Sequence, residues 1–420
     1  MMNVKNSKTL CVLPWLMRYI HNDGRFYLCC ISASDPDNAL KDDSGKPLFV
    51  QNVKHLNLLD DCQRLQTIKK LLSQNQWPDE CRKCREHEAR GSLSHRLLKN
   101  KEFAKSIDSI ESGTSNIEIL DLRLGNFCNL RCVMCGPDAS HLWVDKWNQL
   151  QPKSLEMNKY QLDSFKFQPW PTQNEVWQKI KQDSQHLVSI ELAGGEPLLS
   201  NEAKSFLTSL IQDGHAQNIE LNIITNLTVL TEDWLKIWSH FKRVSLRISL
   251  DGVGEYQELM RPGLRWESFE KNIKKLDLIY LQFPFSEVNI NFTLQALNAK
   301  QLVPVMKWLQ EFEHIAPLPH VSILSEPEYM DSRWLSESIK TDLIKLWNRE
   351  LDSIVSGPQF DQIKNQWLID SFERASGWLK GPAPKAAQAH AWSQRLLKDK
   401  ELHSQLKKCD LELLLFLLSL

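Results

Sequence analysis

Three cysteines near position 130 stand close enough in the sequence to bind a metal cluster together. Cys128, Cys132 and Cys135 have the spacing C-x3-C-x2-C and directly follow an apolar run. With ten cysteines in 420 residues, chance gives such a triple in about 0.006 of chains. Three thiolates can hold a cubane iron-sulfur cluster, but they leave one iron without a protein ligand. An open coordination position is where a metal site does chemistry, so this loop is predicted to bind a further ligand.

A second set of cysteines lies in the first 105 residues. Cys11 and Cys29 are separated by twelve residues, a glycine and four more residues, and Cys81 and Cys84 form a C-x2-C pair. Four thiolates make a closed site that fits either tetrahedral zinc or a fully ligated [4Fe-4S] cluster. Cys30 follows Cys29 directly and is an alternative ligand, and the spacing does not decide between the two.

The segment 117–324 alternates short apolar strands with helical stretches, which is typical of a parallel sheet covered by helices. Six β/α units predict an α/β fold with a partial (βα)6 TIM-like barrel, whose active-site residues follow the carboxyl ends of the strands. The predicted strands span 117–124, 187–193, 219–225, 243–250, 288–294 and 320–324. The predicted helices between them span 202–212, 232–241, 266–280 and 301–312.

The composition divides the chain into four segments. Residues 1–105 carry most of the cysteines and are predicted to form a small α+β domain. Residues 106–116 contain several serines and a glycine and are typical of a linker. The barrel then spans 117–330, and residues 331–420 form a tryptophan-rich, helical appendage.

The cysteine loop resembles a known family. The run from Cys128 to Cys135, with Leu130, Arg131 and Met134 between the ligands, is similar to the cluster loop of radical S-adenosylmethionine (SAM) enzymes, and its place after the first strand also matches. The resemblance implies that SAM chelates the open iron of a [4Fe-4S] cluster. It also implies that transfer of one electron cleaves SAM to methionine and a 5'-deoxyadenosyl radical, and that this radical removes a hydrogen atom from the substrate.

Three weaker motifs follow later strands in the order that this family shows. After the second strand comes the turn Gly194, Gly195, Glu196 and Pro197, and the resemblance implies that it receives the methionine ammonium of SAM. The resemblance also implies further cofactor contacts at the ends of the third and fourth strands. These are Thr225 and Asn226 on the third strand, and Ser249 and Asp251 on the fourth.

The amino-terminal cysteines resemble the SPASM and twitch domains of radical enzymes. Pro14 and Trp15 after Cys11, the doublet at 29–30 and the run 77–81 carry this resemblance. It implies an auxiliary [4Fe-4S] cluster held by Cys11, Cys29, Cys81 and Cys84. Such domains most often follow the barrel, whereas this one precedes it. The cysteines that a full SPASM motif adds after the C-x2-C pair are missing, so we expect a single auxiliary cluster.

Charge and apolar runs exclude several other classes of protein. Lys and Arg total 51 against 52 Asp and Glu, so the chain has no excess of positive charge for nucleic acid or an anionic membrane. The apolar runs at 10–17 and 411–420 are too short to span a bilayer, and the first lacks a cleavage site. We therefore expect a cytoplasmic protein, in which clustered cysteines indicate metal binding rather than disulfides.

The predicted function is a radical SAM enzyme of the oxidoreductase or peptide-modifying type. Its substrate is expected to be a peptide or a small metabolite, and an electron donor such as flavodoxin or ferredoxin is its expected partner. The alternative is a zinc-binding or electron-transfer iron-sulfur protein without radical catalysis.

Several single residues remain as weaker candidates. Arg123 and Arg247 lie on predicted strands and could reach a carboxylate or the cofactor, although pairing with a neighbouring acid is commoner. His141 follows the cysteine loop and could orient a substrate. Cys62 and Cys409 have no partner spacing and are expected to be buried apolar residues.

Overall fold

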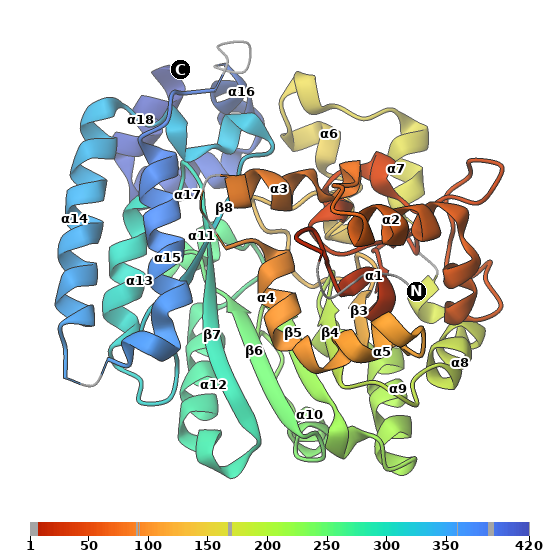
Figure 1. Cartoon of the computed structure of the whole chain (residues 1–420). Coiled ribbons are helices and arrows are strands. Elements are labelled where there is room, and N and C mark those ends of the chain that lie inside the picture. The colour runs from red at the N-terminus through yellow and green to blue at the C-terminus, as the bar shows by residue number, and fades with distance from the viewer. Residues whose placement is uncertain are drawn as a thin grey trace. The chain divides into compact units, whose positions relative to one another are not determined.

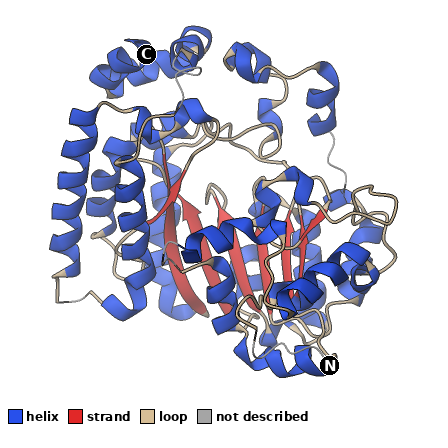
Figure 2. Ribbon diagram, turned by 45° about the horizontal axis from the view of Figure 1, so that its top comes forward, coloured by secondary structure: helices blue, strands red, loops and turns tan. Residues whose placement is uncertain are grey.

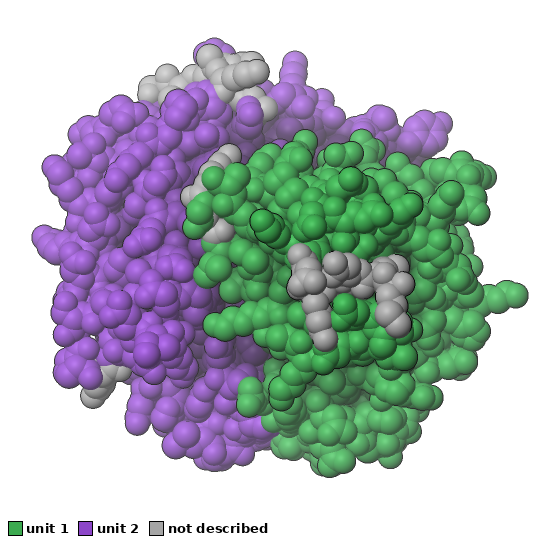
Figure 3. Space-filling model, viewed as in Figure 1, with its two compact units in different colours: residues 1–125, 168–222, 236–243 green, residues 126–167, 223–235, 244–420 purple. Residues whose placement is uncertain are grey.

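The computed structural model describes residues 7–89, 91, 93–166, 170–358, 360–384 and 390–419. The chain divides into two units, which Figure 3 shows in different colours. Unit 1 comprises residues 1–125, 168–222 and 236–243, and unit 2 comprises residues 126–167, 223–235 and 244–420. Each unit is described by itself below.

Eight strands form one sheet in the order β2-β1-β3-β4-β5-β6-β7-β8 (Figures 1 and 2). β1 runs antiparallel to β2 and parallel to β3, and the pairs β3–β4, β6–β7 and β7–β8 are parallel. All six strands that the sequence predicts are present to within a few residues, and the mostly parallel sheet confirms the predicted fold class. The strands are β1 (Met17–Ile20), β2 (Phe26–Tyr27), β3 (Ile119–Arg123), β4 (Ser189–Ala193), β5 (Glu220–Thr225), β6 (Arg243–Ser249), β7 (Phe285–Leu294) and β8 (His320–Ile323).

Unit 1 contains strands β1 to β4 and the helices that pack on them. In α9, Ala203, Phe206, Leu207 and Leu210 are buried, which is the spacing of one helix face, and the Ser200 side chain caps the amino terminus. The helices are α1 (Leu13–Leu16), α2 (Gln63–Ser73), α3 (Arg82–Ala89), α4 (His95–Glu102), α5 (Ile107–Ser112), α8 (Asn174–Gln182) and α9 (Asn201–Gln212).

Unit 2 contains β6 from residue 244 onward, β7, β8 and most of the remaining helices. The free edge of β8 is partly satisfied by α15, because the backbone N–H of Val321 donates to the Ser371 hydroxyl (2.9 Å). The helices are α6 (Trp147–Leu150), α7 (Lys159–Lys166), α11 (Glu255–Met260), α12 (Trp266–Ile279), α13 (Leu302–Leu309), α14 (Glu337–Val355), α15 (Gln362–Leu379), α16 (Ala391–Lys398), α17 (Lys400–Cys409) and α18 (Leu411–Ser419). α10 (Glu232–Trp238) begins in unit 2 and ends in unit 1.

The structure adds elements that the sequence did not indicate. β1 and β2 join the sheet, and the register pairs Tyr19 with Asp121. The expected linker 106–116 carries the helix α5, which Gly113 ends with a left-handed conformation (φ +75°). The predicted helices are confirmed by α9, α10, α12 and α13, and the described part of residues 331–420 is mostly helical, in α14 to α18. The four-segment division itself stays a prediction. In the described part of the chain, no helix is long and apolar enough to cross a membrane.

Candidate active site

The cysteine loop after β3 is held in place by bonds from two sides. Its backbone amides at Arg131 and Val133 donate to the carbonyls of Pro262 and Met260, both at 2.9 Å. Gly263 permits this approach, because a Cβ there would lie 3.0 Å from the Asn129 carbonyl oxygen. On the other side, the Trp143 indole donates to the Cys132 carbonyl (3.0 Å), and the Ser140 hydroxyl donates to the Leu130 carbonyl (2.7 Å). The loop is therefore part of a fixed framework within unit 2.

His141 supports the same loop. Its Nδ1 accepts from the backbone N–H of Cys128 (3.3 Å), and its ring stacks on Phe127 with 5.1 Å between the ring centroids. The sequence suggested that His141 could orient a substrate. In the structure its Nδ1 holds the backbone of a predicted cluster ligand, and the role in orienting a substrate stays a prediction.

The three thiols of the loop lie near one another and receive hydrogen bonds. Cys128 Sγ accepts from the backbone N–H of Leu130 (3.4 Å). The hydrogen bond between Cys132 and Cys135 lowers the pKa of the Cys132 thiol and raises that of Cys135 well above its usual value. Cys128 and Cys132 are buried, and Cys135 is partly exposed.

The donor set consists of three thiols on one loop, which fits a cluster held by three thiolates. Among the residues that the structure describes, no three His, Cys, Asp or Glu side chains converge closely enough to hold one metal ion. A cubane cluster occupies the space between its ligands, so its thiolates surround it rather than meet at one point. Cys128, Cys132 and Cys135 are the residues of unit 2 that would hold it.

An arginine that the sequence did not single out contacts this site. Arg261 Nη1 donates to Cys132 Sγ (3.5 Å), and its Nε and Nη2 donate to Asp251 Oδ2 at 2.8 and 2.7 Å. Both side chains are buried, with exposed fractions of 8% and 0%. Burial opposes the charge of Arg261, but Asp251 and Cys132 outweigh it and raise its pKa above the usual value. A full positive charge therefore lies beside the cysteine loop.

Asp251 positions this arginine. Its Oδ1 accepts from the backbone N–H of Thr293 (2.8 Å), and its own backbone N–H donates to Gln257 Oε1 (2.8 Å). The Gln257 amide also donates to the Ser249 carbonyl (3.2 Å). The structure thus places Asp251 against Arg261, while its predicted contact with the cofactor, like that of Ser249, stays a prediction.

Asn226 reaches the cysteine loop from the end of β5. Its Nδ2 lies 3.8 Å from Cys128 Sγ and donates to Asn129 Oδ1 (3.0 Å). Leu227 follows with φ +52°, an unfavourable conformation for a branched residue, and its backbone N–H donates to Thr225 Oγ1 (2.9 Å). The structure thus brings Asn226, one of the predicted motif residues, to a predicted cluster ligand.

The predicted Gly-Gly-Glu-Pro turn belongs to unit 1. Gly194 and Gly195 have φ values of +79° and +52°, and a Cβ on Gly194 would lie 2.9 Å from the backbone nitrogen of Leu124. Glu196 is buried, and its Oε1 accepts from the backbone N–H of Leu198 (3.0 Å). Glycine is thus required for the backbone path, and the cofactor role of the turn, including Pro197, stays a prediction.

The second cysteine set gathers in unit 1. Cys11, Cys29, Cys81 and Cys84 line one small cavity. Burial raises the pKa of the Cys11 thiol far above its usual value, and repulsion from Cys81 and Cys29 adds to the effect. Cys11 is therefore a poor anion by itself, and a bound metal is what would keep it deprotonated.

Cys30 faces a different group. Burial raises the pKa of its thiol, and the next cause is the neighbouring Asp121 carboxylate. Asp121 and Glu191 both pair with Arg123 at 2.9 Å, and burial raises the pKa of Asp121 to about 7. Arg123 therefore follows the commoner pattern of a strand arginine paired with acids.

The two remaining cysteines lie apart from both sets. Cys62 is buried, as predicted, and its thiol donates to the Lys41 carbonyl (3.3 Å). Cys409 is only partly buried.

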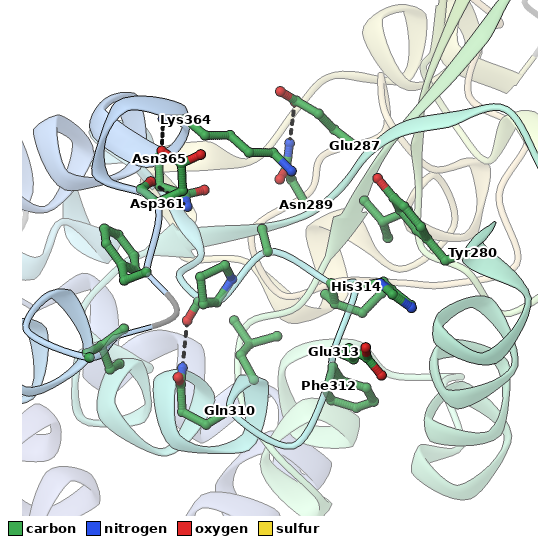
Figure 4. Close-up of a pocket in the computed structure, with 18 of the residues that line it drawn as sticks. Tyr280, Glu287, Asn289, Gln310, Phe312, Glu313, His314, Asp361, Lys364 and Asn365 are labelled. Carbon is green, nitrogen blue, oxygen red and sulfur yellow. Dashed lines mark hydrogen bonds between the residues drawn. The ribbon is translucent and has the colours of Figure 1, made fainter.

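Two cavities of unit 2 differ in their relation to this site. One of about 660 Å³ is lined by Met134 and Cys135 of the cysteine loop, together with Trp147 and Glu328. The other, of about 520 Å³, lies between the first half of β7, the loop 310–317 and the start of α15 (Figure 4). The first could admit a ligand to the cysteine loop, and the second is lined by none of the predicted site residues.

Residues 122–278 match the model of the Radical SAM superfamily. This match includes the cysteine loop, all the predicted cofactor residues and Arg261, but not the amino-terminal cysteines. No curated protein matches the chain.

Several solved structures resemble the chain at low similarity. One is anSMEcpe with bound AdoMet, at 18% identity and a TM-score of 0.36, covering 57% of this chain and 60% of that one. Another is Streptococcus suis SuiB bound to precursor peptide SuiA, at 13% identity and a TM-score of 0.37, covering 66% of this chain and 59% of that one. The chain thus spans about three fifths of each of these solved chains.

Proposed function

Residues 122–278 form a radical SAM domain, and from this premise we propose that the protein cleaves SAM reductively at a [4Fe-4S] cluster held by Cys128, Cys132 and Cys135. Two hydrogen bonds to sulfur support this assignment most directly. Asn226 donates to Cys128 Sγ, and Arg261 donates to Cys132 Sγ. N–H donors aimed at sulfur stabilise thiolates, which are the form that binds iron.

The chain's own residues would bind the cluster and hold its ligands in place. A cluster held by Cys128, Cys132 and Cys135 would supply the electron for reductive cleavage of SAM, and the products would be methionine and a radical able to take a hydrogen atom from the substrate. Asn226 and Arg261 hold two of the ligands, while His141 and Trp143 fix the loop backbone. Burial of Cys128 and Cys132 limits the access of water and oxygen to this side of the cluster.

The four cysteines of unit 1 are proposed to hold an auxiliary [4Fe-4S] cluster. Their common cavity supports one site, and Cys29 is favoured over Cys30 as the ligand because Cys29 lines this cavity and Cys30 does not. Such a cluster would accept the electron that a substrate radical must lose in a net oxidation. The substrate is proposed to be a peptide or a small metabolite, and a flavodoxin or a ferredoxin is the proposed electron donor.

Anaerobic reconstitution with iron and sulfide tests this proposal. We expect about eight irons per chain, for two cubane clusters, and release of 5'-deoxyadenosine when the reduced protein meets SAM. Cys132→Ala should abolish the release, whereas Cys81→Ala should leave much of it because the first cluster is intact. A protein that binds zinc at both sites and releases no 5'-deoxyadenosine would instead support the zinc-binding alternative. Full iron loading without SAM cleavage would support electron transfer alone.

A further inference from the structure

Trp143 connects the cysteine loop to the rest of unit 2. It is fully buried, with an exposed fraction of 1%, and its indole N–H donates to the Cys132 carbonyl (3.0 Å). The guanidinium of Arg131, which lies between the first two cysteines of the loop, packs over the same ring at 5.1 Å from the ring centroid. The loop therefore contacts this indole both with its backbone and with a side chain.

A second guanidinium packs on the Trp143 ring from outside the radical SAM domain. Arg395 belongs to α16, which Figure 1 labels, and its guanidinium carbon lies 4.8 Å from the ring centroid. The side chain is 1% exposed, and its Nη2 pairs with Asp399 Oδ2 at 3.2 Å. In the described part of the chain, its Nε and Nη1 have no hydrogen-bond partner. The indole ring is therefore a main partner of this buried charge, and cation–π attraction is stronger where water is excluded.

Two acids near the start of α17 compensate the two arginines. Asp399, the partner of Arg395, also accepts from the backbone N–H of Leu402 (3.1 Å) and so caps α17. Glu401 Oε2 lies 3.6 Å from Arg131 Nη2. The negative charges reduce the repulsion between two guanidinium groups that contact one ring.

α16 also binds the segment that follows Trp143. Lys398 Nζ donates to the backbone carbonyls of Asn148 and Gln151 at 3.3 and 2.8 Å. Two side chains of one helix thus hold Trp143 and the residues after it.

We propose that Arg395 is a positioning residue of the cysteine loop, and that it acts through Trp143 on the Cys132 carbonyl. The proposal rests on the proposed function, because it gives the helices beyond the radical SAM domain a part in holding the cluster ligands. Without the Arg395 charge, the indole ring is free to move, its hydrogen bond to Cys132 weakens, and the backbone of the loop opens more often.

Hydrogen exchange of the iron-free protein, followed by mass spectrometry, tests this connection. Arg395→Met should raise the exchange rate of the amides of residues 128–135 about tenfold, because methionine fills the space without the charge. Arg395→Lys keeps a positive charge near the ring and should restore most of the protection. Lys400→Met is the matched control, because Lys400 is exposed at the start of α17, and its loss should change exchange less than about twofold.

A double-mutant cycle separates this role from general packing. Trp143→Phe removes the indole N–H and keeps an aromatic ring, so it should raise exchange in the loop by itself. Adding Arg395→Met to Trp143→Phe should then raise it by much less than tenfold, because the contact with Cys132 is already lost. Independent effects of the two replacements would overturn the proposal, and so would a rise that is equal in the loop, α12 and β7. Loop exchange in Arg395→Met equal to that of the unchanged protein would also overturn it.

Electron paramagnetic resonance of the reconstituted protein gives a second readout. In a Cys81→Ala, Cys84→Ala background, Arg395→Met should change the g-values of the reduced loop cluster, and Lys400→Met should not. An unaltered spectrum for Arg395→Met would contradict the proposal. If the unchanged protein binds no cluster at this loop, the proposed function fails, while hydrogen exchange of the iron-free protein still decides whether Arg395 positions the loop.

Discussion

Replacing Arg261 by Met should lower the reduction potential of the cluster that we propose at the cysteine loop. The guanidinium donates to Cys132 Sγ at 3.5 Å and is held by Asp251 from the other side. Positive charge and hydrogen bonds near cluster sulfurs favour the reduced cluster, which carries one more negative charge. Methionine has a similar length but provides neither the charge nor the hydrogen bond.

The size of this effect follows from the distance. With an effective dielectric constant of about 20 and about 6 Å between guanidinium and cluster, one positive charge contributes about 3 kcal/mol. For a one-electron couple, about 1.4 kcal/mol corresponds to about 59 mV. The midpoint potential of Arg261→Met should therefore fall by about 120 mV. The double variant Arg261→Met, Asp251→Asn also lacks the opposing negative charge of Asp251. Its midpoint potential should therefore lie between that of Arg261→Met and that of the unchanged protein.

Redox titration followed by electron paramagnetic resonance (EPR) measures these potentials without requiring turnover. The double variant also guards against unfolding, because Arg261→Met alone leaves a buried carboxylate unpaired at a cost of about 3–5 kcal/mol. Arg265→Met is the control, since Arg265 is exposed and follows the same turn. A potential for Arg261→Met equal to or above that of the unchanged protein would refute the electrostatic reasoning.

Two further predictions concern unit 1. Cys29→Ala should lose the iron of the auxiliary site, whereas Cys30→Ala should keep it, and the reverse result in an iron assay would show that the ligand is Cys30. Gly194→Ala should lower the free energy of unfolding by about 2 kcal/mol or more, because its Cβ would meet the Leu124 backbone at 2.9 Å. Gly214→Ala is the control, because Gly214 also has a positive φ (+73°) but no atom within 4 Å of the added Cβ. If thermal melts show equal losses of stability for Gly194→Ala and Gly214→Ala, the close approach of Gly194 to the Leu124 backbone is unimportant.

The sequence predicts the repeating part of the fold well. The strands β3 to β8 are marked by buried apolar residues, either in a run, as in β3, or in alternation with polar residues, as in β6. The periodicity of α9 and α12 is that of a helix with one buried face. β1 could not be recognised because it has four residues, follows a single helical turn and pairs with a strand about a hundred residues later. Local pattern carries no information on such a distant partner.

The candidate site was predictable where its residues are close in sequence. The spacing of Cys128, Cys132 and Cys135 identifies the loop by itself, but Arg261 lies 129 residues from Cys132 and has no motif that links the two. The family resemblance predicts a cofactor contact at Asp251, and the structure shows that this side chain also positions Arg261. Long-range contacts of this kind depend on packing that the sequence pattern does not reveal.

EPR of the reduced cluster in the Cys81→Ala, Cys84→Ala variant tests the central claim most directly, because only the cluster of the cysteine loop should remain there. If SAM binds an open iron, adding it should change the g-values of the signal, and a cubane cluster with four protein ligands should not respond. We predict a changed spectrum on addition of SAM, which Cys132→Ala should eliminate together with the signal. An identical spectrum with and without SAM would contradict the account.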